Sequence, residues 1–283
     1  MPDIFSYPFF QNAAAALTVI SIVSAMIGTY IVTRRLVAIS GGITHACFGG
    51  LGLGYYFGVN PILMAGVFAV ASAVGVEFMA TRARVREDSA IAVVWALGMA
   101  VGILFVFLTP GYVPELNSFL FGNVLTVTRA DLLAFGVFAV VVALFYALMY
   151  RSIVLCAFDP DFARVMHLPV RFVNYAMTVL IAVCIVLTIR LVGVMLLMSM
   201  FALPQMVAEM WCRRFASLMW LSMAVSLVCC LGGLMLGTVI DVPASALIVL
   251  TMVAAYVVAA VARPVVTALR RRRESSVSGP RAS

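Results

Sequence analysis

Nine apolar runs divide this sequence, and each is long enough to cross a lipid bilayer. They span about 18 to 26 residues, or roughly 27 to 39 Å as helix, against a hydrocarbon core of about 30 Å. Backbone polar groups in lipid must be satisfied within the span, so such runs fold as helices. The sequence predicts an all-α integral membrane protein, a bundle of eight or nine transmembrane helices that forms one domain over residues 1–263. The nine runs occupy residues 10–33, 36–57, 61–80, 89–109, 131–150, 172–189, 191–210, 215–240 and 243–262.

The composition excludes a soluble fold of this length. Of the 283 residues, 65% are hydrophobic and only 10% are charged, which leaves too little polar sequence to cover an apolar core in water. The six cysteines are scattered, without a C-x-x-C pair, so they are expected to be small buried apolar residues and not a redox or metal motif.

The arginines predict the orientation of the spans. All 18 basic residues are arginine, and all but Arg129 and Arg190 fall in alternate loops or in the C-terminal segment. Positive loops stay in the cytoplasm, so the N-terminus is expected outside and the C-terminus inside. The basic, Ser-rich tail at 264–283 is expected to be disordered and to lie near anionic membrane lipid. Arginines that cluster between apolar runs indicate topology control, so no nucleic-acid partner is expected.

No P-loop is present. The G-x-x-x-x-G-K-S/T pattern requires a lysine, and the chain contains none, so any ATP hydrolysis must come from another polypeptide.

A membrane-embedded enzyme is one of the functions that such a helical bundle could have. The chain contains neither H-E-x-x-H nor paired aspartates within its apolar runs, so the sequence gives that alternative little support.

The segment 40–54 is the first candidate for function. Six glycines in fifteen residues allow close approach of neighbouring helices, which predicts a central helix. His45 lies ten residues after Arg35, about 15 Å along a helix and therefore near the bilayer midplane. His45 and the adjacent Thr44 are predicted to line a transport path, with the imidazole as a metal ligand. The alternative is a histidine that only bonds a neighbouring helix.

The segment 156–169 is the second candidate. Asp159 followed by Pro160 predicts a helix start, and Pro169 predicts its end, about two turns later. Phe162 lies on one side of this short helix and charged residues on the others. Such a helix can dock in a groove of a soluble partner, or it can be an amphipathic connector on the membrane surface.

The segment 190–209 is the third candidate, because Pro204 is expected to kink a spanning helix and free a carbonyl group. Its methionines at 195, 198 and 206 could ligate soft metals, but packing is the favoured interpretation. Glu77 and Glu209 lie near span ends, where a structural role is expected.

These segments resemble the ABC-3 family of metal-uptake ABC transporter permeases, the zinc, manganese and iron class. The run 39–54 is similar to the family's I-G-D-A-L-S-H-A motif with its glycine-rich continuation, and Asp159-Pro160-Asp161-Phe162-Ala163-Arg164 is similar to its coupling segment. Three further landmarks follow the family's order, namely Leu120-Phe121-Gly122, the VGVMLLMSMFALP run before Gln205, and Asp241-Val242-Pro243-Ala244-Ser245.

The resemblance implies a permease in the bacterial cytoplasmic membrane that is not itself an enzyme. It implies a homodimer, a cytoplasmic ATP-binding subunit that contacts Asp159, Pro160, Asp161 and Arg164, and an extracytoplasmic solute-binding protein. The substrate would be a divalent metal, Zn²⁺ or Mn²⁺ with Fe²⁺ as a further candidate, and no cofactor would be permanently bound.

The chain departs from the family at one path residue. The family places metal-contacting groups at the motif histidine, here His45, and at an aspartate four residues earlier, here Gly41. Loss of that carboxylate removes a hard oxygen ligand that favours Mn²⁺ or Fe²⁺. The site therefore uses other groups, selects zinc differently, or handles another substrate such as a siderophore, haem or cobalamin chelate.

Overall fold

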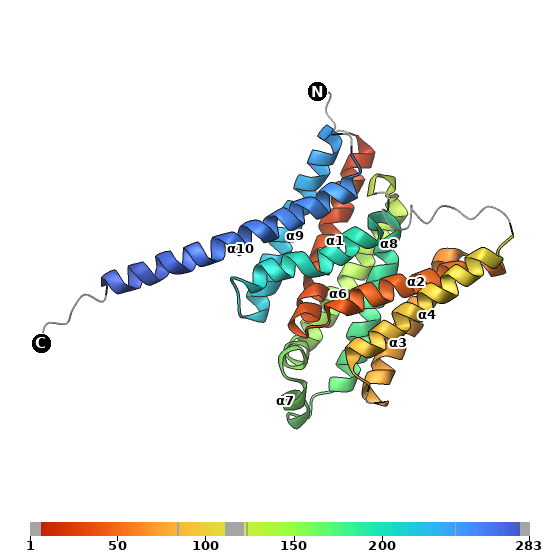
Figure 1. Cartoon of the computed structure of the whole chain (residues 1–283), viewed down its shortest axis with the longest axis horizontal. Coiled ribbons are helices and arrows are strands. Elements are labelled where there is room, and N and C mark those ends of the chain that lie inside the picture. Colours follow the sequence, from red (N-terminus) through yellow and green to blue (C-terminus); the bar gives the residue numbers. More distant parts are fainter. Residues whose placement is uncertain (1–6, 84, 111–121, 123, 241, 278–283) are drawn as a thin grey trace, which may run out of the picture.

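A computed structural model describes residues 7–83, 85–110, 122, 124–240 and 242–277, and these residues form a helical bundle (Figure 1). The motif residues Leu120, Phe121 and Asp241, Arg84, and the tail after 277 lie outside the described residues. Within the described part, nine segments are long and apolar enough to cross a membrane, and no strand is present. The prediction of an all-α bundle of nine spans is confirmed. The helices are α1 (Pro8–Thr33), α2 (Val37–Phe57), α3 (Pro61–Thr81), α4 (Glu87–Leu108), α6 (Arg129–Phe158), α7 (Pro160–Val165), α8 (Val170–Glu209), α9 (Phe215–Ile240) and α10 (Ala244–Val277), with a short 3₁₀ turn η2 (Val124–Thr126).

Local signals in the sequence set several helix boundaries. Asn60 caps α3 by accepting hydrogen bonds from two backbone N–H groups, and Thr128 forms a capping box with Asp131 at the start of α6. These side chains satisfy N–H groups that a helix start leaves unpaired. Helix α10 runs past its predicted end and continues to Val277, beyond the boundary expected at 263. Helix α6 has non-helical backbone at Met149 (φ −114°, ψ 15°), next to its predicted end at 150, and then continues as helix to Phe158.

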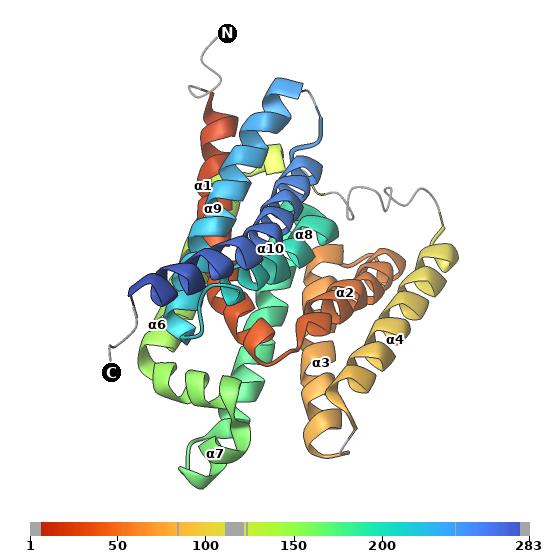
Figure 2. The same cartoon turned by 60° about the vertical axis from the view of Figure 1, so that its left-hand side comes forward.

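The helices form two groups that meet at α8. Helix α2 packs against α3 and α4, while α1, α9 and α10 lie together on the other side (Figure 2). Helix α8 contacts both groups. Most of α1 and α2 is buried, whereas the outer spans α4, α6 and α10 are mostly exposed. The glycine-rich helix is therefore central, as predicted, and the outer spans present apolar faces suited to lipid.

Helix α8 contains two spans joined at Gly193. The structure places the break there, with φ 76° and ψ 167°, a conformation accessible essentially to glycine alone. A side chain on Gly122, itself at φ 61°, would overlap the backbone of Val192 and Gly193. Two of the motifs recognised in the sequence thus meet, and each needs its glycine at this contact.

The kink that the sequence predicts at Pro204 stays a prediction. Pro204 lies inside a helical segment, eleven positions after the non-helical residue Gly193. Its ring leaves the Met200 carbonyl without its usual N–H donor, and the buried Gln205 side chain supplies one instead at 3.2 Å. The same Nε2 donates to the Ser24 carbonyl of α1 at 3.1 Å. The carbonyl freed by Pro204 therefore has a donor in its own helix, and Gln205 joins α8 to α1.

Glycines hold α2 and α4 in backbone contact. A Cβ atom on Gly98 of α4 would overlap the Cα atom of Ala46 on α2, and the backbone cannot yield as a flexible side chain would. Replacing Gly98 by alanine should lower the free energy of unfolding by about 1–3 kcal/mol, the usual cost of overpacking. Thermal denaturation of the purified protein in detergent measures this loss.

Gly136→Ala on α6 is the matched control for this substitution. A Cβ atom there meets no atom within 4 Å outside its own helix, so the unfolding free energy should change by less than about 0.5 kcal/mol. Equal destabilisation by both variants would show that close approach of α2 and α4 is not what Gly98 provides.

Candidate metal path and coupling helix

The imidazole of His45 stacks on an indole ring from another helix. Gly41 and His45 lie four residues apart and therefore share one face of α2. On that face the His45 ring lies parallel to the Trp95 ring of α4, with centroids 4.6 Å apart and planes inclined by 9°. His45 is only half-buried, so the stack fixes the ring's orientation while leaving part of it accessible.

Met198 of α8 completes this group. The position that a Cβ atom would take on Gly41 lies 2.8 Å from Cε of Met198 and 3.5 Å from the Trp95 ring. Met198 thus occupies the space next to Gly41 where the resemblance led us to expect a carboxylate. We call Gly41, His45, Trp95 and Met198 the α2–α4–α8 cluster.

The sequence pointed to only part of this cluster. It singled out Gly41 and His45, assigned Met198 to packing, and gave no reason to choose Trp95. A tryptophan in the first half of an apolar span was the available signal. In the described residues, no group of three or more His, Cys, Asp or Glu side chains could hold a metal ion.

Thr44 has a partner within its own helix. Its hydroxyl donates to the Ser40 carbonyl, and its side chain is fully buried. Such a bond to residue i−4 is the ordinary way for threonine to satisfy its hydroxyl in a helix. Cys47, two residues past His45, is also buried. The structure thus brings neither side chain to the imidazole, and Thr44 has no contact that assigns it to the path.

A second polar cluster ties the ends of four helices together. Arg34, just after α1, donates to Glu87 of α4 at 2.9 Å and to Asn174 of α8 at 2.8 Å. Tyr30 bonds the same Asn174 oxygen at 3.1 Å. Glu77 of α3 lines the small cavity beside them, 7% exposed, with one carboxylate oxygen lacking a hydrogen-bond partner. The sequence had treated Arg34 only as a topology signal, because its partners lie 53 and 140 residues away.

Helix α7 is a short projection at the end of the bundle opposite residue 7 (Figures 1 and 2). Asp159 caps it by accepting from the N–H groups of Asp161 and Phe162, and Pro160 takes the first helical position. His167 ends it at φ 55°, with N–H bonds from His167 to Arg164 and from Leu168 to Ala163. These are the two bonds of a Schellman cap. The predicted helix is present, though it is shorter than two full turns.

The exposed face of α7 is mainly apolar. Phe162, Val165 and Met166 are all exposed, Val165 to 74%. The charged side chains of α7 pair with each other: Arg164 donates to Asp161 at 2.7 Å, and both side chains are exposed. Exposed pairs of this kind contribute little to stability. The sequence analysis expected the ATP-binding subunit to contact charged residues of this helix and did not name Val165. The exposure of Val165 depends on how α7 packs against α6 and α8, which the sequence does not show.

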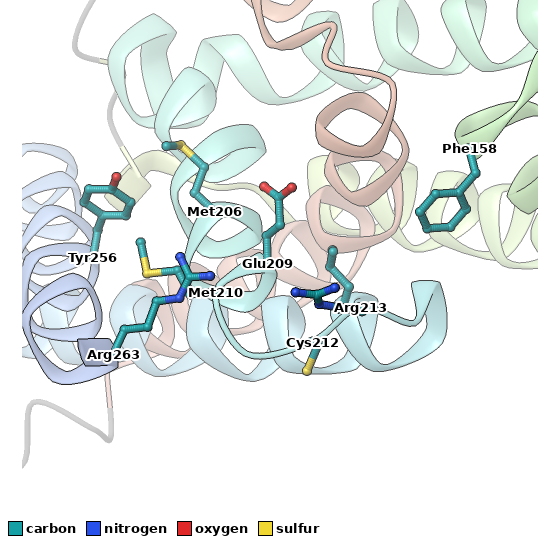
Figure 3. Close-up of a pocket in the computed structure, with 9 residues that line it drawn as sticks. Phe158, Met206, Glu209, Met210, Cys212, Arg213, Tyr256 and Arg263 are labelled. Carbon is teal, nitrogen blue, oxygen red and sulfur yellow. The ribbon is translucent and has the colours of Figure 1, made fainter. Parts of the chain in front are cut away.

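A larger cavity lies where α6, α8, α9 and α10 meet. Figure 3 shows Met206 and Glu209 at the end of α8, Met210 directly after it, and Tyr256 and Arg263 from α10. The lining also includes Phe158, Cys212, Arg213 and Leu218. One carboxylate among arginines and apolar groups is not a set that binds a divalent metal. This cavity is therefore separate in chemistry from the α2–α4–α8 cluster.

Comparison with known proteins identifies relatives along nearly the whole chain. An uncharacterised membrane protein of Synechocystis is 34% identical over 91% of this chain and 92% of its own. The chelated iron transport system membrane protein YfeD of Yersinia pestis is 31% identical, covering 90% and 86% of the two chains. The manganese transport system membrane protein MntC of Halalkalibacterium halodurans is 29% identical, covering 88% and 85%.

A solved structure agrees in fold. PsaBC from Streptococcus pneumoniae in complex with Fab superposes with a TM-score of 0.78 and 25% identity, over 90% of this chain and 92% of that one. The resemblance drawn from the motifs is thereby confirmed. Relatives of this kind are permease subunits of the bacterial inner membrane and are not enzymes, which removes the embedded-enzyme alternative. With residues 6–263 matching the model of the ABC 3 transport family, the chain belongs to that family and is a multi-pass permease of an ABC-type metal transport system.

Proposed function

We propose that this permease imports a divalent metal ion, Zn²⁺ or Mn²⁺, through a path that passes His45. The observation that supports the proposal is the α2–α4–α8 cluster: an oriented, partly accessible imidazole where α2 and α4 meet the central helix α8. Ionisable groups inside membrane spans are rare and are typical of ion pathways.

The energy for import comes from a separate ATP-binding subunit that docks on α7. The orientation predicted from the arginines places α7 in the cytoplasm and the N-terminus outside. Its exposed apolar residues suit a groove on a soluble partner. When the ATP-binding subunits close, they pull on α7, and the two helix groups rock about α8 so that the path opens first to one side and then to the other. A solute-binding protein delivers the metal from outside, and two copies of this chain form the membrane unit.

A metal chelate is the second candidate substrate. The relative from Yersinia pestis is named for chelated iron, and Gly41 leaves this path without the carboxylate expected from the resemblance. A chelate presents its own ligands, so it needs fewer from the protein.

Uptake assays separate these possibilities. The permease is expressed with its ATP-binding subunit and solute-binding protein in cells that lack their own importers, and accumulation of ⁶⁵Zn²⁺, ⁵⁴Mn²⁺ and ferric siderophore is measured. Uptake of a free ion that stops when the ATP-binding subunit carries a hydrolysis-deficient substitution supports the proposal. Uptake of the chelate alone supports the second candidate, and uptake that continues without ATP hydrolysis contradicts both.

A further inference from the structure

The α2–α4–α8 cluster presents soft ligand atoms at the place where a carboxylate would supply hard oxygen ligands. The Met198 terminus lies over Gly41, and the Trp95 ring lies against both Gly41 and His45. The cluster therefore combines an imidazole nitrogen, a thioether sulfur and an aromatic ring. The nearest acidic residues in sequence on α4, Asp88 and Glu87, lie seven and eight positions before Trp95, about 10 and 12 Å along the helix, and Glu87 is paired with Arg34.

These groups differ in the metals that they prefer. Thioether sulfur and imidazole suit Zn²⁺ and Cu⁺, whereas Mn²⁺ and Mg²⁺ prefer carboxylate, carbonyl and water oxygens. Met198 is only partly buried, so its flexible side chain can move toward a passing ion.

We propose that Met198, placed over Gly41, is a specificity residue that makes this path prefer Zn²⁺ to Mn²⁺. This inference rests on the proposed function, because it concerns the substrate of the same path. The sulfur supplies the ligand that the missing carboxylate does not. Gly41 contributes to the same specificity. A Cβ atom on residue 41 would lie 2.8 Å from the Cε methyl group of Met198, so a larger residue there would displace the methionine.

Met198→Leu is the central variant, because it removes the sulfur and nearly conserves volume. The purified full-length permease is titrated in detergent with Zn²⁺ and with Mn²⁺, and binding is followed by the fluorescence of Trp95, with Trp95→Phe as the control for the signal. We expect Met198→Leu to weaken Zn²⁺ binding about tenfold, which corresponds to about 1.4 kcal/mol, and to leave Mn²⁺ binding unchanged.

A second variant tests the converse. Gly41→Asp combined with Met198→Ala places a carboxylate in the space that the methionine vacates, and it should raise Mn²⁺ affinity relative to Zn²⁺. The ⁶⁵Zn²⁺ to ⁵⁴Mn²⁺ uptake ratio is measured in parallel with the same partner proteins, so that only the permease differs. A fall in that ratio for Met198→Leu and a further fall for the double variant are expected.

The outcomes distinguish this inference from the proposed function. Uptake and binding with the wild-type Zn²⁺ to Mn²⁺ preference in Met198→Leu would overturn the role of Met198 and leave metal import standing. A wild-type permease that binds Mn²⁺ more tightly than Zn²⁺ would overturn it as well. Absence of any ATP-dependent metal uptake by the wild type would overturn the proposed function, and the inference with it.

Discussion

Metal uptake should fall to the background of untransformed cells when His45 is replaced by alanine. The substitution removes the imidazole of the α2–α4–α8 cluster and leaves Trp95 without its stacking partner. An ion crossing the bilayer centre without a ligand there must be moved with its charge uncompensated, which costs several kcal/mol. Because each 1.4 kcal/mol is about tenfold in rate, a drop of at least about a hundredfold is expected. ⁶⁵Zn²⁺ accumulation per cell, normalised to the amount of permease in the membrane, measures it.

Assembly and a neighbouring substitution provide the controls for His45→Ala. The variant should still copurify with its ATP-binding subunit, because α7 lies at the end of the bundle and packs against α6 and α8. Thr44→Val keeps the shape of the adjacent residue and removes only a hydroxyl bonded within its own helix. Its uptake should stay within about twofold of wild type. Unchanged uptake in His45→Ala would remove the imidazole from the path.

Transport should also be lost when a charge is placed on the apolar face of α7. Val165 is 74% exposed, so Val165→Asp can be accommodated by the free permease without burying a carboxylate. In the docked state that carboxylate would be desolvated against an apolar groove, at a cost of about 2–5 kcal/mol. We expect the ATP-binding subunit to dissociate during copurification and ATP-dependent uptake to fall by at least about tenfold.

Val165→Thr is the matched control on α7, since it retains the branched shape and adds no charge. It should copurify and transport normally.

Arg164→Glu should weaken coupling by a different route. In the wild type Arg164 donates to Asp161 at 2.7 Å, whereas the variant has carboxylates at both positions. Like charges at this spacing destabilise a helix. An ATP-binding subunit that remains bound in both Val165→Asp and Arg164→Glu would place the docking surface elsewhere on the permease.

The sequence predicted the spans well because their signal is local. Hydrophobic length alone located nine segments, and most ends agree to within a few residues with the structure. The cap of α7 was also readable, since Asp159 and Pro160 act on the N–H groups of the next turn. Helix α6 is an exception: after the non-helical residue Met149 it continues through Arg151 to Phe158, because Arg151 ends the apolar run but is a good helix former.

Sequence reasoning missed Gly193 for a physical reason. Proline is the strongest helix breaker in isolation, so Pro204 was the natural choice. In the folded protein Gln205 supplies the missing donor to Met200, and the non-helical residue of α8 is Gly193, whose backbone nitrogen a Cβ atom on Gly122 would overlap. This contact joins residues 71 positions apart in the sequence, so a local sequence signal does not reveal it.

By itself the sequence determined that this chain is a nine-span membrane protein, that a histidine lies deep in its central helix, and that it carries no ATP-binding P-loop of its own. Only the tertiary structure decided what surrounds that histidine. Trp95 and Met198 come to Gly41 and His45 from α4 and α8, and Arg34 finds Glu87 and Asn174 in the same way. Membrane insertion depends on consecutive residues within one span, whereas ligand sets form between spans by close packing and interhelical hydrogen bonds. No single span contains that information.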